Sequence, residues 1–255
     1  MGKIKCLSLM LLSVALSLSF MACSSDEDDG RKLNQSELSL IAGQSVKLVY
    51  DGGCTWKSEE PLIAEVDNNG NVTANRVGET IIWANDEKCK IRVSPKYNTY
   101  MEPCIKWNAS ETEVIDFMKG YQYLGKNDNT LSFIDDDKNF AYVYIFKNNL
   151  LSSSAIATNI LSYGEEVSNF LLERYVVVNV DKTNNICYLA SIDMTIAVLV
   201  YFESNDGLMT VIYLPFNVDS VDVISKISDL KSRISKKQML YNVDIVNDLV
   251  DKFTK

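Results

Sequence analysis

Residues 33–93 contain about seven short runs of alternating apolar residues, each separated from the next by turn-forming residues. The clearest turn is Asn69-Gly70, which stands between two such runs. A two-residue hairpin of type I′ needs positive φ at both central positions, and Asn-Gly adopts this conformation readily. Short strands at this spacing pack as two facing sheets, so residues 33–95 are predicted to form a β-sandwich.

The motifs of this segment follow the order of a known family. They are Leu40-Ile-Ala-Gly43-Gln-Ser-Val46, Thr55-Trp56-Lys-Ser58-Glu-Glu-Pro61, Ile63-Ala64-Glu-Val66-Asp67-Asn-Asn-Gly70 and Val77-Gly78-Glu-Thr-Ile-Ile82-Trp-Ala84. This pattern resembles the bacterial Ig-like group 2 domain. The resemblance implies an immunoglobulin-like sandwich, used in surface adhesins and also as a plain spacer, with Trp56 in its core and no catalytic residues. Trp83 alternates with Ile82 and Ala84, so we expect it to point outward, toward a neighbouring domain or a ligand.

The first 22 residues are predicted to be a lipoprotein signal peptide. Two lysines precede an apolar run, Cys6–Phe20, which is too short to span a bilayer. Ser19-Phe20-Met21-Ala22-Cys23 then resembles a lipobox, which implies lipid chains on Cys23 and attachment to a membrane. The alternative is an ordinary secretory signal that is cut after Ala22.

Residues 23–32 form an acidic tether, in which positions 24–30 carry a charge of −4. Directly behind a lipidated cysteine, this run resembles the signal that exports lipoproteins to the outer face of the outer membrane in one group of Gram-negative bacteria. We therefore expect the protein to be lipid-anchored in the outer membrane and to face the cell exterior. The alternative to an export signal is that the acidic run is only a solvated linker.

Residues 96–218 are predicted to form an α+β domain. Ser110 and Glu113 form a capping-box signature at the start of a helix over 111–119, and a second helix fits 165–173. Four strand-like runs follow each helix, which indicates a weak tandem repeat and an antiparallel sheet with helices on one face. Around residues 102–107 the segment is similar to an uncharacterised module common in gut bacterial lipoproteins.

The tail, residues 219–255, carries apolar residues at helical spacing and is predicted to form two amphipathic helices, 219–235 and 240–253. Strands 140–146 and 196–202 are apolar on both sides, so the second face of the sheet needs a cover. We expect the tail helices to pack on this domain. The alternative is a hairpin that binds a partner.

Cysteine and histidine usage limits the chemistry. The chain has no histidine, which excludes Ser-His-Asp triads, Cys-His dyads and His-ligated metals. Four cysteines remain after Cys6 and Cys23, and an exported protein can pair them. The first candidate for a disulfide is Cys54–Cys89, within the sandwich, unless a strand lies between the two residues and keeps the thiols too far apart. The alternative is four free thiols.

No metal or cofactor site is expected. Asp135-Asp136-Asp137-Lys138-Asn139 begins like a calcium-binding loop, but Phe140 and Phe146 stand where the loop needs glycine and glutamate. We interpret this run as a β-turn.

The charge distribution argues against nucleic acid as a partner. The net charge is −9, and residues 96–218 carry 8 basic and 15 acidic side chains, so −7. The candidate binding surface is a group of tyrosines, unless these side chains belong to the core. Its members are Tyr142, Tyr144, Tyr201 and Tyr213.

These observations favour a non-enzymatic surface lipoprotein whose Ig-like domain presents the α+β domain for binding a protein or glycan. Two other classes stay open. One is a carboxylate-dependent glycan hydrolase, which needs two acidic side chains in a cleft, one of them with a raised pKa. The other is a structural subunit of a surface complex.

Overall fold

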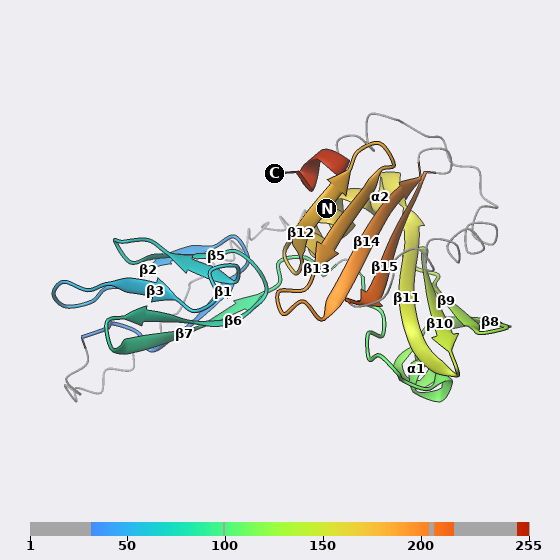
Figure 1. Ribbon diagram of the computed structural model, residues 1–255, viewed down its shortest axis with the longest axis horizontal. Helices are drawn as coiled ribbons and strands as arrows, with labels where there is room; N and C mark the ends of the chain where they lie inside the picture. The colour runs from blue at the N-terminus through green and yellow to red at the C-terminus, as the bar shows by residue number, and fades with distance from the viewer. Residues whose placement is uncertain (1–31, 99, 204–206, 217–248, 255) are drawn as a thin grey trace, which may run out of the picture. The chain divides into compact units, whose positions relative to one another are not determined.

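The computed structural model of the chain describes residues 32–98, 100–203, 207–216 and 249–254 (Figure 1). The predicted signal peptide, the predicted lipidation site Cys23 and most of the two predicted tail helices lie outside these residues. The described part is mostly β-strand, with seven strands before residue 95 and eight after it.

The first seven strands form two sheets with the orders β1-β7-β6-β3 and β2-β5-β4. β1 pairs parallel with β7, and the other neighbours pair antiparallel. Buried residues of both sheets share one core, which makes this part of the chain a sandwich. The strands are β1 (Glu37–Ile41), β2 (Ser45–Lys47), β3 (Trp56–Ser58), β4 (Ala64–Val66), β5 (Asn71–Ala74), β6 (Gly78–Ala84) and β7 (Glu87–Ser94).

The turn between β4 and β5 is wider than the two-residue hairpin predicted from Asn69-Gly70. Within this turn, only Gly70 has a positive φ, at 82°. The Asp67 carboxylate accepts hydrogen bonds from the backbone N–H groups of Asn69 and Asn71, each at 2.8 Å, and these bonds stabilise the longer turn. The prediction of a hairpin is confirmed, since β4 and β5 pair antiparallel, but the predicted turn type is wrong.

The remaining eight strands form one sheet of order β12-β13-β14-β15-β11-β10-β9-β8, in which every neighbouring pair is antiparallel. One helix precedes each group of four strands. The elements are α1 (Glu111–Phe117), β8 (Gln122–Asn127), β9 (Thr130–Asp135), β10 (Phe140–Lys147), β11 (Leu150–Asn159), α2 (Ile160–Leu172), β12 (Val176–Asp181), β13 (Ile186–Ala190), β14 (Ile196–Glu203) and β15 (Leu208–Pro215).

Helix α2 begins five residues before the expected start at residue 165. Asn159 is its N-cap, and the side-chain oxygen accepts a hydrogen bond from Ser162 N at 2.8 Å. An asparagine at the end of a strand carries no periodicity of its own, so the apolar spacing placed the helix start too late.

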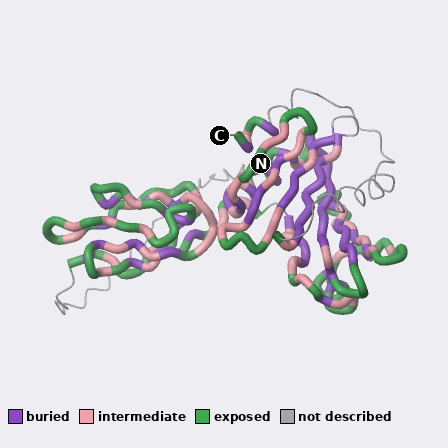
Figure 2. The backbone as a smooth tube through the Cα atoms, viewed as in Figure 1, coloured by how far each residue is buried: buried purple, intermediate pink, exposed green. Residues whose placement is uncertain are grey.

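The two faces of the eight-stranded sheet carry separate apolar clusters. The larger cluster includes the buried side chains of α1 and α2 together with Leu249, Val250 and Phe253. The smaller cluster consists of sheet residues alone, and its buried members are Ala155, Leu199, Ile212 and Leu214. Figure 2 shows how continuously the central strands are buried.

The described end of the tail packs against α2. A Cβ added at Gly164 of α2 would lie 2.7 Å from Leu249 Cδ1, and the Phe253 ring lies 6.1 Å from that of Phe202. These residues therefore pack on the same sheet face as α2. The rest of the predicted tail helices, and with it the expected cover of the second face, lies outside the described residues.

Candidate functional site

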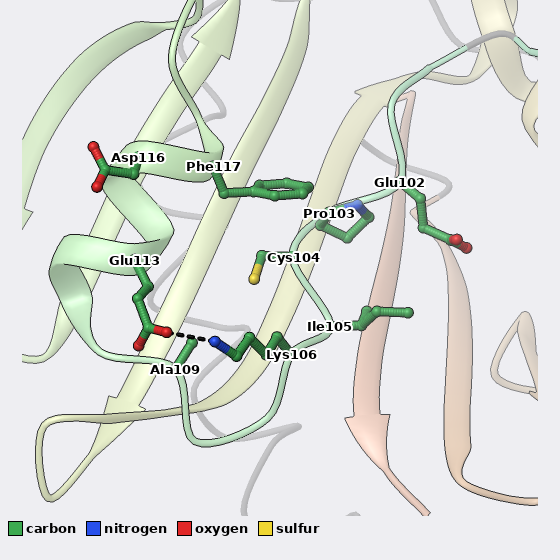
Figure 3. A pocket seen from close by; sticks show the side chains of 9 residues that line it. All are labelled: Glu102, Pro103, Cys104, Ile105, Lys106, Ala109, Glu113, Asp116 and Phe117. Atoms are coloured by element: carbon green, nitrogen blue, oxygen red, sulfur yellow. Dashed lines mark hydrogen bonds and ion pairs between the residues drawn. The ribbon is translucent and has the colours of Figure 1, made fainter.

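A groove lies between helix α1 and the segment 102–109 that precedes it (Figure 3). The capping box predicted from Ser110 and Glu113 is confirmed: the Ser110 hydroxyl accepts from Glu113 N, and Glu113 Oε2 accepts from Ser110 N at 2.8 Å. This cap fixes where α1 begins. The opposite wall is held by Ser154, whose Oγ donates to Cys104 O at 2.5 Å.

The groove has a volume of about 730 Å³ and combines apolar walls with charged groups. Figure 3 shows the Phe117 ring beside Pro103, with the Cys104 sulfur between these two residues and the Lys106–Glu113 ion pair. The Phe117 side chain is 43% exposed. An open groove with one exposed aromatic ring and a few fixed polar groups fits the general pattern of ligand sites. Its lining residues are Glu102, Pro103, Cys104, Ile105, Lys106, Ala109, Glu113, Asp116 and Phe117.

The ion pair at the groove has a clear electrostatic effect. Lys106 Nζ lies 2.5 Å from Glu113 Oε1, and this hydrogen bond, with those from Ser110, lowers the pKa of Glu113 to about 2. The same contact raises the pKa of Lys106 above its usual value. Both side chains are therefore charged at neutral pH.

Glu102 also lines the groove, but its side chain turns away from α1 (Figure 3). Its Oε1 accepts a hydrogen bond from the Tyr175 hydroxyl at 2.5 Å. Burial raises the pKa of Glu102, although Tyr175 and Arg174 act in the opposite direction. Two other buried tyrosines, Tyr100 and Tyr213, share a hydroxyl–hydroxyl hydrogen bond of 2.7 Å.

The tyrosine surface expected from sequence does not form. Tyr142, Tyr144 and Tyr213 are each 0% exposed and belong to the larger core cluster, while Tyr201 on β14 is half-buried. β10 and β15 lie inside the sheet, and the face that carries these three rings is the one against α2. The alternative that they belong to the core therefore holds for these three residues.

Trp83 lies on β6 and is half-buried. Its indole Nε1–H donates to Glu59 Oε1 at 2.9 Å. This contact within the sandwich occupies the polar edge of the ring.

Cys54 and Cys89 are free thiols, as are Cys104 and Cys187, so the expected bridge is not formed. Cys54 precedes β3 and Cys89 lies on β7, with β6 between these strands in the sheet. Two strand spacings amount to about 9.6 Å, beyond the limit of about 7 Å between bridged Cα atoms.

The acidic run at 135–137 ends β9 and enters the turn to β10, as interpreted from the sequence. Asp135 Oδ1 accepts from Lys138 N at 3.3 Å. Across the described ranges, no group of three or more Cys, Asp or Glu side chains could hold a metal ion.

The sequence contained a signal for the groove that the tyrosine hypothesis overlooked. Val114 and Met118, four residues apart, face the core, which leaves Ile115 and Phe117 on the outer faces of α1. An aromatic residue on the outward side of a short helix is the feature that marks this site.

The sandwich belongs to a recognised class of domain. Residues 41–87 match the family model of the intimin immunoglobulin-like domain, and they run from the end of β1 to the start of β7. The chain therefore contains a bacterial Ig-like domain. No curated protein matches the chain. Within the part that the structure describes, no helix is long and apolar enough to cross a membrane.

Proposed function

We propose that this chain is a non-enzymatic outer-membrane surface lipoprotein whose Ig-like domain presents the eight-stranded domain for binding a protein or glycan. The observation that carries the proposal is the exposed Phe117 ring in a groove with a fixed ion pair. A flat apolar ring binds the apolar face of a sugar or a side chain, while charged groups beside it hydrogen-bond to hydroxyl or amide groups.

Helix α1 offers a matched pair of residues to test this site. Ile115 and Phe117 are both 43% exposed, but only Phe117 lines the groove. We expect Phe117→Ala to weaken binding at least tenfold, which corresponds to about 1.4 kcal/mol. Ile115→Ala should leave the affinity unchanged.

The measurement uses defined ligands. Laminarihexaose, mannohexaose and xylohexaose are titrated by calorimetry, and mucin, collagen and fibronectin are tested as immobilised proteins. Binding of any of them that Phe117→Ala weakens and Ile115→Ala spares supports the groove. Equal loss in both variants, or no binding by the wild type, contradicts it.

The membrane attachment rests on the lipobox-like residues before Cys23. We propose that lipid chains on Cys23 anchor the protein and that the acidic residues at 26–29 direct it to the cell exterior. Cys23→Ala should release the protein from membranes. Replacement of residues 26–29 by alanine should retain it in the periplasm, which protease treatment of whole cells detects.

The finer classification is also part of the proposal. The order of motifs from Leu40 to Ala84 supports assignment of the sandwich to the Ig-like group 2 domains. The sequence of one helix and four strands, twice in succession, supports an α+β tandem repeat, and the segment around 102–107 supports the module common in gut bacterial lipoproteins.

One observation favours a second candidate, a carboxylate-dependent glycan hydrolase. Glu102 and Glu113 both line the groove, and their pKa values shift in opposite directions, as a general acid and its ionised partner require. Against it, the Glu102 side chain turns toward Tyr175 (Figure 3). Release of reducing sugar from the three hexasaccharides, abolished in Glu102→Gln, would establish the hydrolase and overturn the binding proposal.

A further inference from the structure

Strand β8 (Gln122–Asn127) is an open edge of the eight-stranded sheet. No strand within the described ranges pairs with its outer side. Five of its six residues are exposed, and Tyr123 and Leu124 retain 50% and 55% exposure. An edge of this kind presents unpaired N–H and C=O groups to which another extended chain can bind.

The local backbone leaves room for such a chain. The β8–β9 register shifts between Tyr123 and Gly125, so Leu124 bulges out of the ladder. Gly125 has φ +131°, and no atom lies within 4 Å of the position where its Cβ would be. A glycine with open space at a strand edge permits close approach of a second backbone.

The opposite edge of the sheet, at β12, differs because the described end of the tail lies beside it. β12 (Val176–Asp181) is followed by Lys182, whose Nζ lies 2.7 Å from Asp251 Oδ1. The described end of the tail is thus ion-paired beside that edge. β8 has no such contact with the tail residues that the structure describes.

Carboxylates stand at both ends of β8. A groove of about 610 Å³ lies where the strand begins, lined by Tyr121, Gln122 and the carboxylates of residues 135–137. Asp128 is exposed in the hairpin at the other end. Of the lysines nearby, Lys119 pairs with Asp116 and Lys126 pairs with Glu111. Lys138 directly follows the acidic run, but the four carboxylates of residue 128 and residues 135–137 outnumber it. The charge around this edge is therefore complementary to a basic segment.

We propose that β8 binds an extended segment of a partner protein by strand addition, and that the segment has a lysine or arginine at each end and alternating apolar residues between them. The main-chain hydrogen bonds of β8 hold the segment. The carboxylates at 135–137 and Asp128 bind its basic side chains, while Tyr123 and Leu124 contact its apolar ones. This site is separate from the groove at Phe117.

The probe is a fluorescein-labelled peptide, Lys-Val-Thr-Val-Thr-Val-Lys, measured by fluorescence polarisation on the full chain. We expect binding tighter than about 1 mM, the weakest affinity that such a titration resolves. Two peptides N-methylated at alternate residues, one for each strand edge, keep the charge but lose hydrogen-bond donors. At least one of them should bind ten times more weakly.

Two variants test the contacts, and two others serve as controls. Leu124→Lys adds a cation at the edge, and Asp135→Asn combined with Asp137→Asn removes two carboxylates; each should weaken binding at least fivefold. Leu161→Lys on α2, where Leu161 is 48% exposed, is the matched control and should not change the affinity. Phe117→Ala should also leave it unchanged, which separates this site from the proposed groove.

Several outcomes would overturn the proposal. No binding below about 1 mM would do so. If both N-methylated peptides bind as tightly as the unmethylated probe, charge alone attracts the probe. Dimerisation of the wild type in sedimentation experiments, abolished by Leu124→Lys, would assign the edge to a second copy of the chain instead.

Discussion

The Tyr175 hydroxyl donates a hydrogen bond of 2.5 Å to Glu102 Oε1, which joins the residue before β12 to the segment before α1. Glu102 is partly buried there, and burial is the largest cause of its raised pKa. Folding therefore favours the protonated form of this carboxyl group.

We expect Glu102→Gln to stabilise the protein at neutral pH. The wild type should lose stability as pH rises from about 4.5, the ordinary value of glutamate, through the raised pKa of the folded state. Glutamine accepts the same hydrogen bond without a charge, so the variant lacks this loss. Thermal melts from pH 4 to pH 8 measure the difference, and equal melting temperatures at pH 7 would contradict the prediction.

Glu113→Gln should change stability in the opposite direction and destabilise the protein at neutral pH. The pKa of Glu113 is lowered to about 2 by Lys106 and Ser110, so its contribution to stability is present above the ordinary pKa and is lost as pH falls toward 2. The variant should melt at a lower temperature than the wild type at pH 7. The gap between the two should close in acid, and a gap that stays constant with pH would refute this account.

Glu173→Gln should be strongly destabilising. The buried carboxylate accepts from Lys96 N at 2.9 Å and from Tyr97 N at 3.0 Å, and it pairs with Arg174. Removal of one partner of a buried pair costs about 3 to 5 kcal/mol. Urea unfolding measures this loss. Glu79→Gln is the control, because its pairs with lysine and arginine on β7 are exposed, and its midpoint should hardly change.

Gly70→Ala should destabilise the sandwich by about 3 kcal/mol or more. The added Cβ would lie 2.5 Å from Leu48 O and 2.8 Å from Trp56 Cζ2, and the backbone has φ +82°. Gly52→Ala has a similar φ of +98° but open space, so it should cost only about 1 kcal/mol. Thermal melts followed by tryptophan fluorescence compare the two, and equal losses would show that the clash is relieved.

Phe253→Ala should cost about 3 kcal/mol, because the ring is 3% exposed and contacts Phe202. Phe216→Ala, at a position 41% exposed, should lower the free energy of unfolding much less, and urea unfolding compares the two variants.

Deletion of 219–255 should lower the free energy of unfolding by several kcal/mol, because it exposes apolar area at about 25 cal/mol per Å². A truncated protein that stays monomeric with an unchanged melting point would favour the tail as a binding element.

Local features were predictable from neighbouring residues. The capping box of Ser110 and Glu113 involves atoms three residues apart, so the start of α1 follows from the sequence. The turn at Gly70 likewise needs a residue that tolerates positive φ. The Ig-like sandwich follows from many such short-range signals in a fixed order, and its family match covers 41–87.

Which residues are buried, and against what, depended on contacts between distant segments. The sequence left open whether Tyr142, Tyr144 and Tyr213 face solvent or the core, and their strands lie inside an eight-stranded sheet against α2. The Cys54–Cys89 pairing failed because β6 lies between the strands. Sequence alone determined the cap of α1, the glycine in the β4–β5 turn and the strand spacing, since these depend on adjacent residues, but it missed the type of that turn and the Asn159 cap of α2. Only the tertiary structure decided the groove, the open edge at β8 and the core tyrosines, because strand order and packing set which side chains reach solvent.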